Sequence, residues 1–593
     1  MNTQQLKRSI VVVALAALLP IGCSVNLSPD KHTELDDETR TSRQQQTSAP
    51  EPKLVLRESG QSTTRQEQVT IVDSPAPVAK RMGEKRLDSL VGIATSEETM
   101  RTRDLPSIRY PSEPIDRETY KHFDDNPVKR VAEHPVSTFS IDVDTGAYAN
   151  LRRFLQAGRL PLEDAVRVEE LINYFSYKYS QAKDKSRPFH VTTEIAPAPW
   201  NSKRHLLHIG IKGYDVSNTD LPPANLVFLV DVSGSMRAPN KLELLKTSLK
   251  LLSRQLRSED RISIVVYAGA SGVVLEPVTG NATAKIMSAL DTLTAGGSTN
   301  GAAGIRLAYA MAEQAYIRNG INRVILATDG DFNVGTVNFE ALKDLIEQKR
   351  ETGISLTTLG FGTGNYNDQL MEQLADAGNG NYGYIDNLKE AQKVLVDEIS
   401  STMHTIAKDV KIQIEFNPNV VAEYRLIGYE NRILKREDFN NDKVDAGEIG
   451  AGHTVTALYE IVLRGSDALY LEPARYSPQT KGTHKHSDEL AFVRMRYKLP
   501  GGAKSTLTEW PLMKGDVTTT IAATSDNFRF SAAVAAFGQL LRGGIYTGDM
   551  TYADVVELAR DARGRDRFGY RGEFIQLANL AQTLATANKQ ARR

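Results

Sequence analysis

Hydrophobic residues in the middle of the chain form short continuous runs that alternate with helical spacings. Residues 226–230 are all apolar, which is typical of a strand buried on both faces. After them, leucines recur at steps of three and four, the spacing of an amphipathic helix (Leu242, Leu245, Leu249, Leu252 and Leu256). The alternation continues, with strands expected at 261–267, 273–278, 324–327, 355–361 and 382–385 and helices at 284–293, 305–315, 339–349, 368–375 and 388–403. This order predicts a doubly wound α/β sheet, mostly parallel with one reversed edge strand.

The period of the apolar positions changes from residue 410 onward. Residues 410–416 alternate between apolar and polar side chains, the pattern of a half-buried strand. Similar runs follow at 421–429, 454–463, 490–499 and 505–512. Short strands separated by turn residues predict a β-sandwich. Beyond residue 525 the pattern becomes helical, at 528–541, 552–562 and 573–587.

Two strand-like segments, 189–195 and 205–211, stand apart because they precede the α/β region. Two strands alone are not stable in water. We therefore expect them to pair with strands that follow residue 408, so that the α/β region is inserted into the sandwich. This arrangement predicts that residues 223 and 405 lie close together, opposite the carboxyl ends of the parallel strands. The α/β domain is then a head presented on a stalk.

Loops at the carboxyl ends of the predicted strands carry oxygen-bearing side chains. Asp231, Ser233 and Ser235 directly follow the first α/β strand, Thr299 precedes a helix, and Asp329 ends another buried strand. This end of an open α/β sheet forms its ligand-binding crevice, and Mg²⁺ takes oxygen ligands of this kind. Taken alone, Asp-x-Ser-x-Ser is equally consistent with a helix N-cap, since Asp and Ser both favour that position.

Together the five side chains resemble, in order and spacing, the metal-ion-dependent adhesion site of von Willebrand factor type A domains. The resemblance covers about residues 223–405. It implies that the two serines and the threonine bind a cation through their hydroxyls, while the aspartates act directly or through water. It also implies that the cation is Mg²⁺, with Mn²⁺ or Ca²⁺ as alternatives, and that it accepts a carboxylate from a protein partner.

Signatures of catalysis are scarce in the chain. It contains no P-loop, no Gly-x-Ser-x-Gly elbow and no His-x-x-x-His or cysteine pair for zinc. The glycine-rich run 360–364 lacks dinucleotide-binding spacing and is expected to be a turn over the rim of the sheet. Asp142-x-Asp144 invites comparison with haloacid-dehalogenase-type phosphatases, whose motif has Thr or Val where Gly146 stands here. The simpler interpretation is a strand end at which Asp144 or Thr145 caps the next helix.

The length and the charge of the chain limit the number of domains and the kinds of partner to expect. A chain of 593 residues is too long for one core, so two to four domains are expected. The formal net charge of −1 does not favour nucleic acid as a partner. The basic and aromatic run 563–571 is expected to be a solvated or ion-paired connection between helices.

Cys23 is the single cysteine of the chain, so no internal disulfide can form. It follows two basic residues and an apolar run at 10–19, which is too short to span a bilayer and fits the h-region of a signal peptide. Residues 18–23 resemble a bacterial lipobox, although Pro20 stands where the pattern prefers leucine. The resemblance implies a triacylated N-terminal cysteine. Ser24, in place of aspartate, resembles the signal for the outer membrane, where the protein is expected to face the periplasm.

The segment between this cysteine and about residue 106 is rich in polar and charged residues and has no aromatic residue. Such a composition predicts a disordered tether. A coil of ~80 residues spans on the order of 50 Å, so the folded part can stand well away from the membrane.

Two further segments resemble parts of bacterial lipoproteins that contain a type A domain. Residues 139–146 and 167–175 are similar to a small domain that precedes it, with a strand at 136–144 and helices at 147–156 and 162–174; residues 408–590 are similar to an uncharacterised C-terminal region. The expected divisions are a signal peptide (1–22), a tether (23–106), an N-terminal von Willebrand-associated α/β segment (107–188), flanking strands (189–222), the type A domain (223–405), a β-sandwich (406–525) and a C-terminal helical segment (526–593).

Three hypotheses of function follow. The first is a lipid-anchored envelope protein, not an enzyme, whose metal site captures an acidic side chain of a protein partner. The second is a metal-dependent, phosphatase-like enzyme that uses Asp142, Asp144 or the rim metal. The third is a non-catalytic structural scaffold of the envelope.

Overall fold

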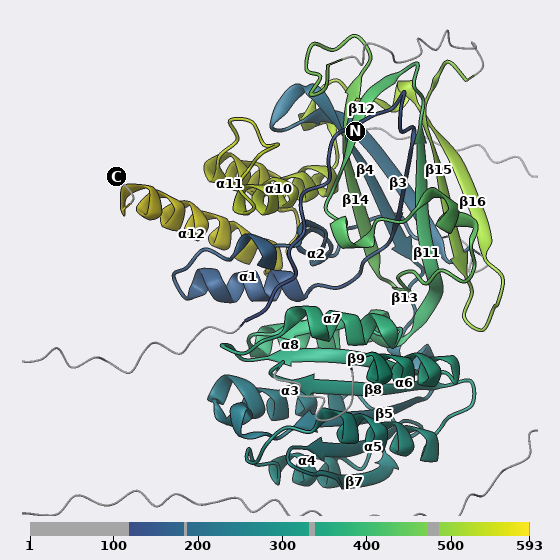
Figure 1. Ribbon diagram of the computed structural model, residues 1–593, viewed down its shortest axis with the longest axis vertical. Coiled ribbons are helices and arrows are strands. Elements are labelled where there is room, and N and C mark those ends of the chain that lie inside the picture. The colour runs from purple at the N-terminus through teal and green to yellow at the C-terminus, as the bar shows by residue number, and fades with distance from the viewer. Residues whose placement is uncertain (1–117, 183–186, 331–338, 473–485, 592–593) are drawn as a thin grey trace, which may run out of the picture. The chain divides into compact units, whose positions relative to one another are not determined.

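Three β-sheets form the framework of the protein in the computed structural model, which describes residues 118–182, 187–330, 339–472 and 486–591. These residues belong to one compact unit. One sheet is the expected α/β sheet, and the other two form the sandwich (Figure 1). The signal peptide, Cys23 and the tether lie outside the described residues.

The α/β sheet has the strand order β10-β9-β8-β5-β6-β7. Its strands are β5 (Ala224–Asp231), β6 (Arg261–Tyr267), β7 (Ser271–Thr279), β8 (Ile321–Thr328), β9 (Ile354–Phe361) and β10 (Tyr382–Ile385). All neighbours are parallel except β6 and β7, so the reversed edge strand is confirmed. Every residue of β5 is buried, as a continuous apolar run in the centre of a parallel sheet predicts.

Helices cover both faces of this sheet (Figure 1). One core contains residues of α3 (Leu244–Ser253), α4 (Thr283–Asp291) and α9 (Ile399–Met403), and the other contains residues of α5 (Gly301–Gln314), α6 (Phe339–Glu351) and α7 (Asp368–Ala377). The single helix expected at 388–403 is instead α8 (Leu388–Gln392), a π-helical turn and α9. An ion pair of 2.8 Å between Lys393 and Glu398 spans the wide turn. No helix in the described ranges is long and apolar enough to cross a membrane.

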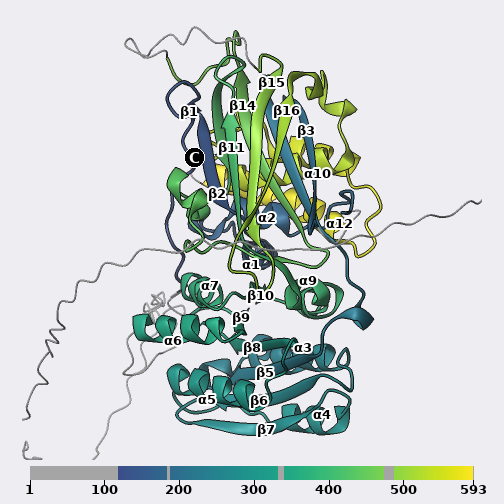
Figure 2. The same ribbon diagram turned by 90° about the vertical axis from the view of Figure 1, so that its right-hand side faces the viewer.

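The sandwich consists of two largely antiparallel sheets that share one core (Figure 2). The first sheet contains β1 (Lys129–Arg130), β12 (Val421–Ile427), β14 (Thr454–Leu463), β4 (Asn201–Gly213) and β3 (Phe189–Ala198). The second contains β13 (Ile449–Gly450), β11 (Thr405–Phe416), β15 (Glu489–Lys498) and β16 (Thr506–Met513), and β2 (Val136–Ser140) also pairs with β11. Ile209 and Ile211 of the first sheet meet Ile412 and Ile414 of the second in the core.

The insertion is confirmed by the pairing of β4 with β14, which runs from Lys212 opposite Thr454 to His205 opposite Ile461. Both ends of the α/β domain therefore meet the sandwich, and Ala224 and Met403 line one pocket. The prediction that the α/β domain is a head held on a stalk is wrong, however. The domain also contacts the N-terminal segment directly. The backbone N–H of Tyr382 in β10 donates to Asp144, and Glu372 of α7 and Glu390 of α8 form ion pairs with Arg167 and Arg152.

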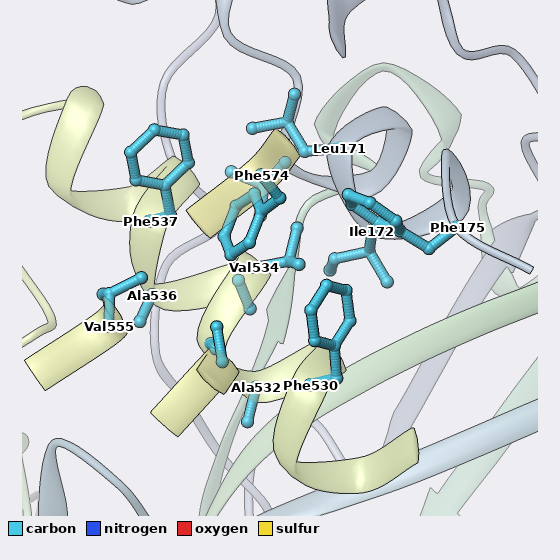
Figure 3. Packing of buried hydrophobic residues seen from close by; sticks show 14 of the residues in the cluster. Leu171, Ile172, Phe175, Phe530, Ala532, Val534, Ala536, Phe537, Val555 and Phe574 are labelled. Atoms are coloured by element: carbon cyan, nitrogen blue, oxygen red, sulfur yellow. The ribbon is translucent and has the colours of Figure 1, made fainter. Parts of the chain in front are cut away.

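The N-terminal segment joins the helices at the C-terminus of the chain. Its helices α1 (Gly146–Gln156) and α2 (Val168–Asn173) share a core with α10 (Asp526–Leu541), α11 (Tyr552–Asp561) and α12 (Tyr570–Ala591). Four phenylalanines form the centre of this core, with ring centroids 4.9 Å apart for Phe175 and Phe530, 5.5 Å for Phe530 and Phe574, and 5.2 Å for Phe537 and Phe574 (Figure 3). Edge-on aromatic packing of this kind stabilises a core beyond its buried area.

Asp144, one of the two residues expected to cap α1, does not cap it. Thr145 occupies the N-cap position without a side-chain bond, and the backbone N–H of Ala147 donates instead to Glu170 Oε2 at 2.8 Å. Asp144 Oδ1 accepts the backbone N–H of Tyr382 at 2.8 Å. Asp144 therefore holds the edge strand β10 of the α/β sheet rather than starting a helix.

Three arginines, of which Arg152 and Arg167 are buried and Arg432 is largely buried, connect the N-terminal segment and the sandwich with the α/β domain. Arg152 pairs with Asp386, with Glu390 at 2.7 Å and with Glu573 at 3.1 Å. Arg167 pairs with Glu170, Asp368 and Glu372. Arg432 reaches Asp142, Asp144, Glu372 and Asp376. Removing one partner of such a buried network leaves an uncompensated charge and is strongly destabilising.

The phenylalanine core yields a stability prediction. We expect Phe574→Ala to lower the free energy of unfolding by about 3–5 kcal/mol, because the ring is fully buried. Urea unfolding followed by tryptophan fluorescence measures the loss, since Trp200 belongs to the same core. The control is Phe568→Ala, whose side chain is 47% exposed, and it should change the stability by less than about 0.5 kcal/mol. Equal effects of the two variants would contradict the packing described.

A second group of carboxylates gives a pH prediction. Asp445 pairs with Arg350 of α6 at 2.7 Å, and Glu448 follows shortly after it. Glu448 Oε1 is buried and has no hydrogen-bond partner within the described residues. Burial, followed by the charge of Asp445, raises the pKa of Glu448 from 4.5 to about 8. The folded state therefore holds this proton more tightly than the unfolded chain does.

The contribution of Glu448 to stability is then fully present below about pH 4.5 and is lost as the pH rises through about 8. We expect Glu448→Gln, which mimics the protonated acid, to flatten the dependence of the unfolding midpoint on pH between these values. Glu557→Gln, on an exposed residue of α11, serves as the control. Parallel pH profiles for the wild type and Glu448→Gln would refute the assignment.

Candidate metal centre

The carboxylate of Asp231 is fixed at the end of β5 by three hydrogen bonds. Its Oδ1 accepts the backbone N–H of Ser233 at 2.8 Å. Its Oδ2 accepts the hydroxyl of Thr328 at 2.8 Å and the hydroxyl of Tyr267 at 3.1 Å. Tyr267 and Thr328 are the last residues of β6 and β8, the two strands beside β5. The parallel pairing of the sheet therefore orients this side chain.

The environment of Asp231 favours a nearby positive charge. The residue is completely buried. Burial raises the pKa of its carboxyl above the ordinary value and the neighbouring charge of Asp329 adds to this, while bonds from Ser233 and Thr328 act in the opposite direction. A cation next to the carboxylate stabilises its charged form.

Ser233 and Ser235 present their hydroxyls to each other in the turn after β5. The two Oγ atoms lie 2.9 Å apart. Ser233 stands at the N-cap position of the 3₁₀ turn Gly234–Arg237, but its side chain makes no capping bond, and neither does the N-cap residue of α3. The capping interpretation of this run is therefore wrong, because the hydroxyls converge on each other instead.

The loop that carries Thr299 is attached to the same turn by backbone hydrogen bonds. Gly296 N donates to Val232 O at 2.7 Å, and Gly234 N donates to Gly297 O at 3.0 Å. Thr299 follows two residues later and is half-buried. The next residue, Asn300, caps α5 with its side chain. The structure thus brings the Thr299 loop to the Asp231 turn.

Asp329 lies one residue beyond β8 and is completely buried. Its Oδ2 accepts the ammonium of Lys241 at 2.8 Å and the side-chain amide of Asn365 at 3.3 Å. Lys241 Nζ also donates to Asn365 Oδ1 at 3.0 Å. Lysine and asparagine therefore hold one oxygen of this aspartate in place.

Sequence reasoning missed four residues of the site: Tyr267, Thr328, Lys241 and Asn365. Tyr267 is the final residue of a predicted strand and Thr328 directly follows another, so the ends of the predicted strands point to them. The other two come from the segment before α3 and from the loop after β9, and no pattern in the sequence connects them with Asp329. Only the folded chain shows that contact.

The donor set fits a hard divalent cation. It combines two carboxylates with hydroxyl oxygens, the ligand type that Mg²⁺ prefers. The described part of the chain holds no cluster of three or more His, Cys, Asp or Glu side chains suited to a metal. The candidate site is of a different kind, because it has only two carboxylates and its other oxygens come from serine and threonine hydroxyls.

Family comparisons agree with this architecture. Residues 225–398 match the von Willebrand factor type A domain, residues 114–208 match a segment described as von Willebrand factor, and residues 401–584 match the C-terminal region of the uncharacterized protein YfbK. The α/β domain is therefore a type A domain.

Whole-chain relatives extend the comparison. Uncharacterized protein YfbK of Escherichia coli K12 is 50% identical over 469 residues, which cover 78% of this chain and 80% of the relative. Human inter-alpha-trypsin inhibitor heavy chain H3 is 24% identical over 266 residues, 41% of this chain and 29% of that protein. A solved von Willebrand factor type A structure from Catenulispora acidiphila is 15% identical, with a TM-score of 0.37 over 65% of this chain and 89% of its own. The match to YfbK over most of both chains shows that this protein belongs to the YfbK family of von Willebrand type A domain proteins.

Proposed function

We propose that this protein binds a protein partner through a divalent cation, Mg²⁺ in the first instance, held at the carboxyl ends of β5 and β8. The type A domain and its relatives support a role in protein interaction. The finer assignment, an adhesion-type metal site made by Asp231, Ser233, Ser235, Thr299 and Asp329, is our inference.

The convergence of the two serine hydroxyls beside a fixed carboxylate carries this proposal. Ser233 and Ser235 lie 2.9 Å apart at their Oγ atoms, and Asp231 already has its orientation set by three donors. Little reorganisation is then needed for these side chains to bind a cation. When bound, Mg²⁺ supplies a Lewis-acidic centre that takes a carboxylate oxygen of the partner.

The surroundings of the site favour binding over hydrolysis. Asp231 accepts three hydrogen bonds, and one oxygen of Asp329 is held by Lys241 and Asn365, so neither is placed as a general base. The phosphatase alternative gains no support from Asp142 and Asp144, since both pair with Arg432. The binding test described next distinguishes metal-dependent binding from a role as a structural scaffold.

We further propose that the protein is anchored in the outer membrane by lipid on Cys23 and faces the periplasm. The lipobox-like run at 18–23 and the serine that follows it support this assignment. Three acyl chains give a stable anchor, because each buried CH₂ contributes ~0.8 kcal/mol.

Removal of the metal ligands tests the binding role. We expect Asp231→Ala and Ser235→Ala to abolish chelator-sensitive capture of an envelope protein by the immobilised full chain. Calorimetry should show that Mg²⁺ binding weakens with them, by roughly 10-fold or more. Ser235 is only partly buried, so its variant keeps the fold intact. Asp344→Ala, on an exposed residue of α6, is the matched control.

The outcome separates the hypotheses. Capture that survives both substitutions and chelation indicates a scaffold, in which the metal plays no part in recognition. Loss of capture by Asp231→Ala and Ser235→Ala, with thermal unfolding of Ser235→Ala unchanged, supports metal-dependent binding.

The anchor is tested by Cys23→Ser. We expect this variant to lose incorporation of radiolabelled palmitate and to leave the outer-membrane fraction, since no thiol remains to be acylated. Cell fractionation with labelling measures both effects. A variant that is still labelled with palmitate would show that Cys23 is not the site of lipidation.

A further inference from the structure

The loop between β9 and α7, residues 362–367, touches the candidate metal centre on one side. We name it the rim loop. Its Asn365 bonds Asp329 and Lys241, as described above. A Cβ added to Gly330, the residue after Asp329, would lie 2.6 Å from Asn367 N. The backbone of the rim loop is therefore packed directly against the Asp329 segment.

On its other side the rim loop pairs with residues 118–120, which we name the strap. The backbone N–H of Thr119 donates to Tyr366 O at 3.0 Å, and Thr119 forms a parallel bridge with Asn367. Gly364 N donates to Glu118 Oε1 at 2.9 Å. The strap thus adds a short extended segment to the outside of the loop.

Helix α1 holds the strap in position. Arg153 forms two hydrogen bonds to the Glu118 carboxylate, at 3.0 and 2.7 Å, and the Glu118 side chain is only 2% exposed. Tyr120 OH donates to Glu118 at 2.8 Å and accepts from Asn150 at 2.7 Å. Burial raises the pKa of Glu118, but Arg153 and the Gly364 N–H outweigh it and lower the pKa below the ordinary value. The residue is therefore charged at neutral pH.

These contacts form a continuous connection from the N-terminal segment to the candidate site: α1, the strap, the rim loop, and Asn365 on Asp329. We propose that Glu118 and Thr119 are positioning residues that, through the rim loop, set the affinity of the site for divalent cations. This inference rests on the proposed metal site and adds to it a control element from outside the type A domain. In the hydrogen bonds described above, neither Glu118 nor Thr119 contacts any of the five candidate ligands.

The physical reason is preorganisation. Partners that orient metal ligands from outside the coordination sphere are typically worth 10- to 100-fold in metal affinity. Without the strap, the rim loop loses a backbone pairing and a charge-assisted bond to Gly364, so Asn365 no longer holds Asp329 in one orientation. Binding of the cation must then pay the entropy of fixing that carboxylate.

Two variants test the connection in the full chain, extracted in mild detergent. Glu118→Ala removes the acceptor for Gly364 N, and Thr119→Pro removes the N–H that binds Tyr366 O. We expect each to weaken Mg²⁺ and Mn²⁺ binding roughly 10-fold in calorimetry. Glu133→Ala, on an exposed glutamate of the same N-terminal segment, is the matched control and should leave the affinity unchanged.

Hydrogen exchange of the rim loop provides a readout that does not depend on metal. Without added cation, the Gly364 amide should exchange faster in Glu118→Ala than in the wild type, while amides of the buried strand β5 keep their protection. Thermal unfolding of each variant reports whether the rest of the chain is intact. A purely structural role would lower the unfolding midpoint without a selective change in the rim loop or in affinity.

The results distinguish this inference from the proposed function. If the wild type binds neither Mg²⁺ nor Mn²⁺, the metal site itself is refuted. If the wild type binds and both strap variants bind equally well or more tightly, the strap does not position the site and this inference fails alone. Weaker binding with faster exchange at Gly364 establishes it.

Discussion

The buried carboxylate of Asp231 is the constraint on which the rest of the site depends. Burying a charge is costly unless hydrogen bonds replace the lost water, and here the donors are the ends of β6 and β8 and the turn after β5. One side chain therefore fixes three segments relative to one another. The serine hydroxyls and the Thr299 loop follow from that arrangement, because both are attached to the same turn.

Much of this arrangement could be predicted from local sequence patterns. The short strand β10 occupies the expected residues, and the β3–β4 pair joins the later strands through β4 and β14 because isolated strands must find partners. Where the local sequence pattern predicted the wrong structure or gave no prediction, a contact outside that pattern determines the structure. The helix expected at 388–403 is interrupted by the π-helical turn that the Lys393–Glu398 ion pair spans. The contact of Asn365 with Asp329 has no periodic signal in the sequence.

Charged residues explain why the type A domain packs directly against the N-terminal segment and the sandwich instead of standing on a stalk. Hydrophobic periodicity treats arginine as a surface residue, yet Arg152, Arg167 and Arg432 are largely buried between elements distant in sequence. Ion pairs of this kind contribute little net stability compared with apolar packing, but they are demanding in geometry. They therefore define the orientation of the type A domain on the sandwich more than they strengthen its attachment.

The pairing of β4 with β14 has a consequence for the order of folding. The strands of the type A sheet all lie between Ala224 and Ile385, so this sheet can form as soon as that stretch of chain is available. The sandwich cannot, since β3 and β4 must await β12 and β14, which are synthesised after the whole inserted domain. Domains generally fold as units while the chain emerges, and contacts between distant segments form slowly. The inner domain is thus complete first, and the outer one closes around its two ends.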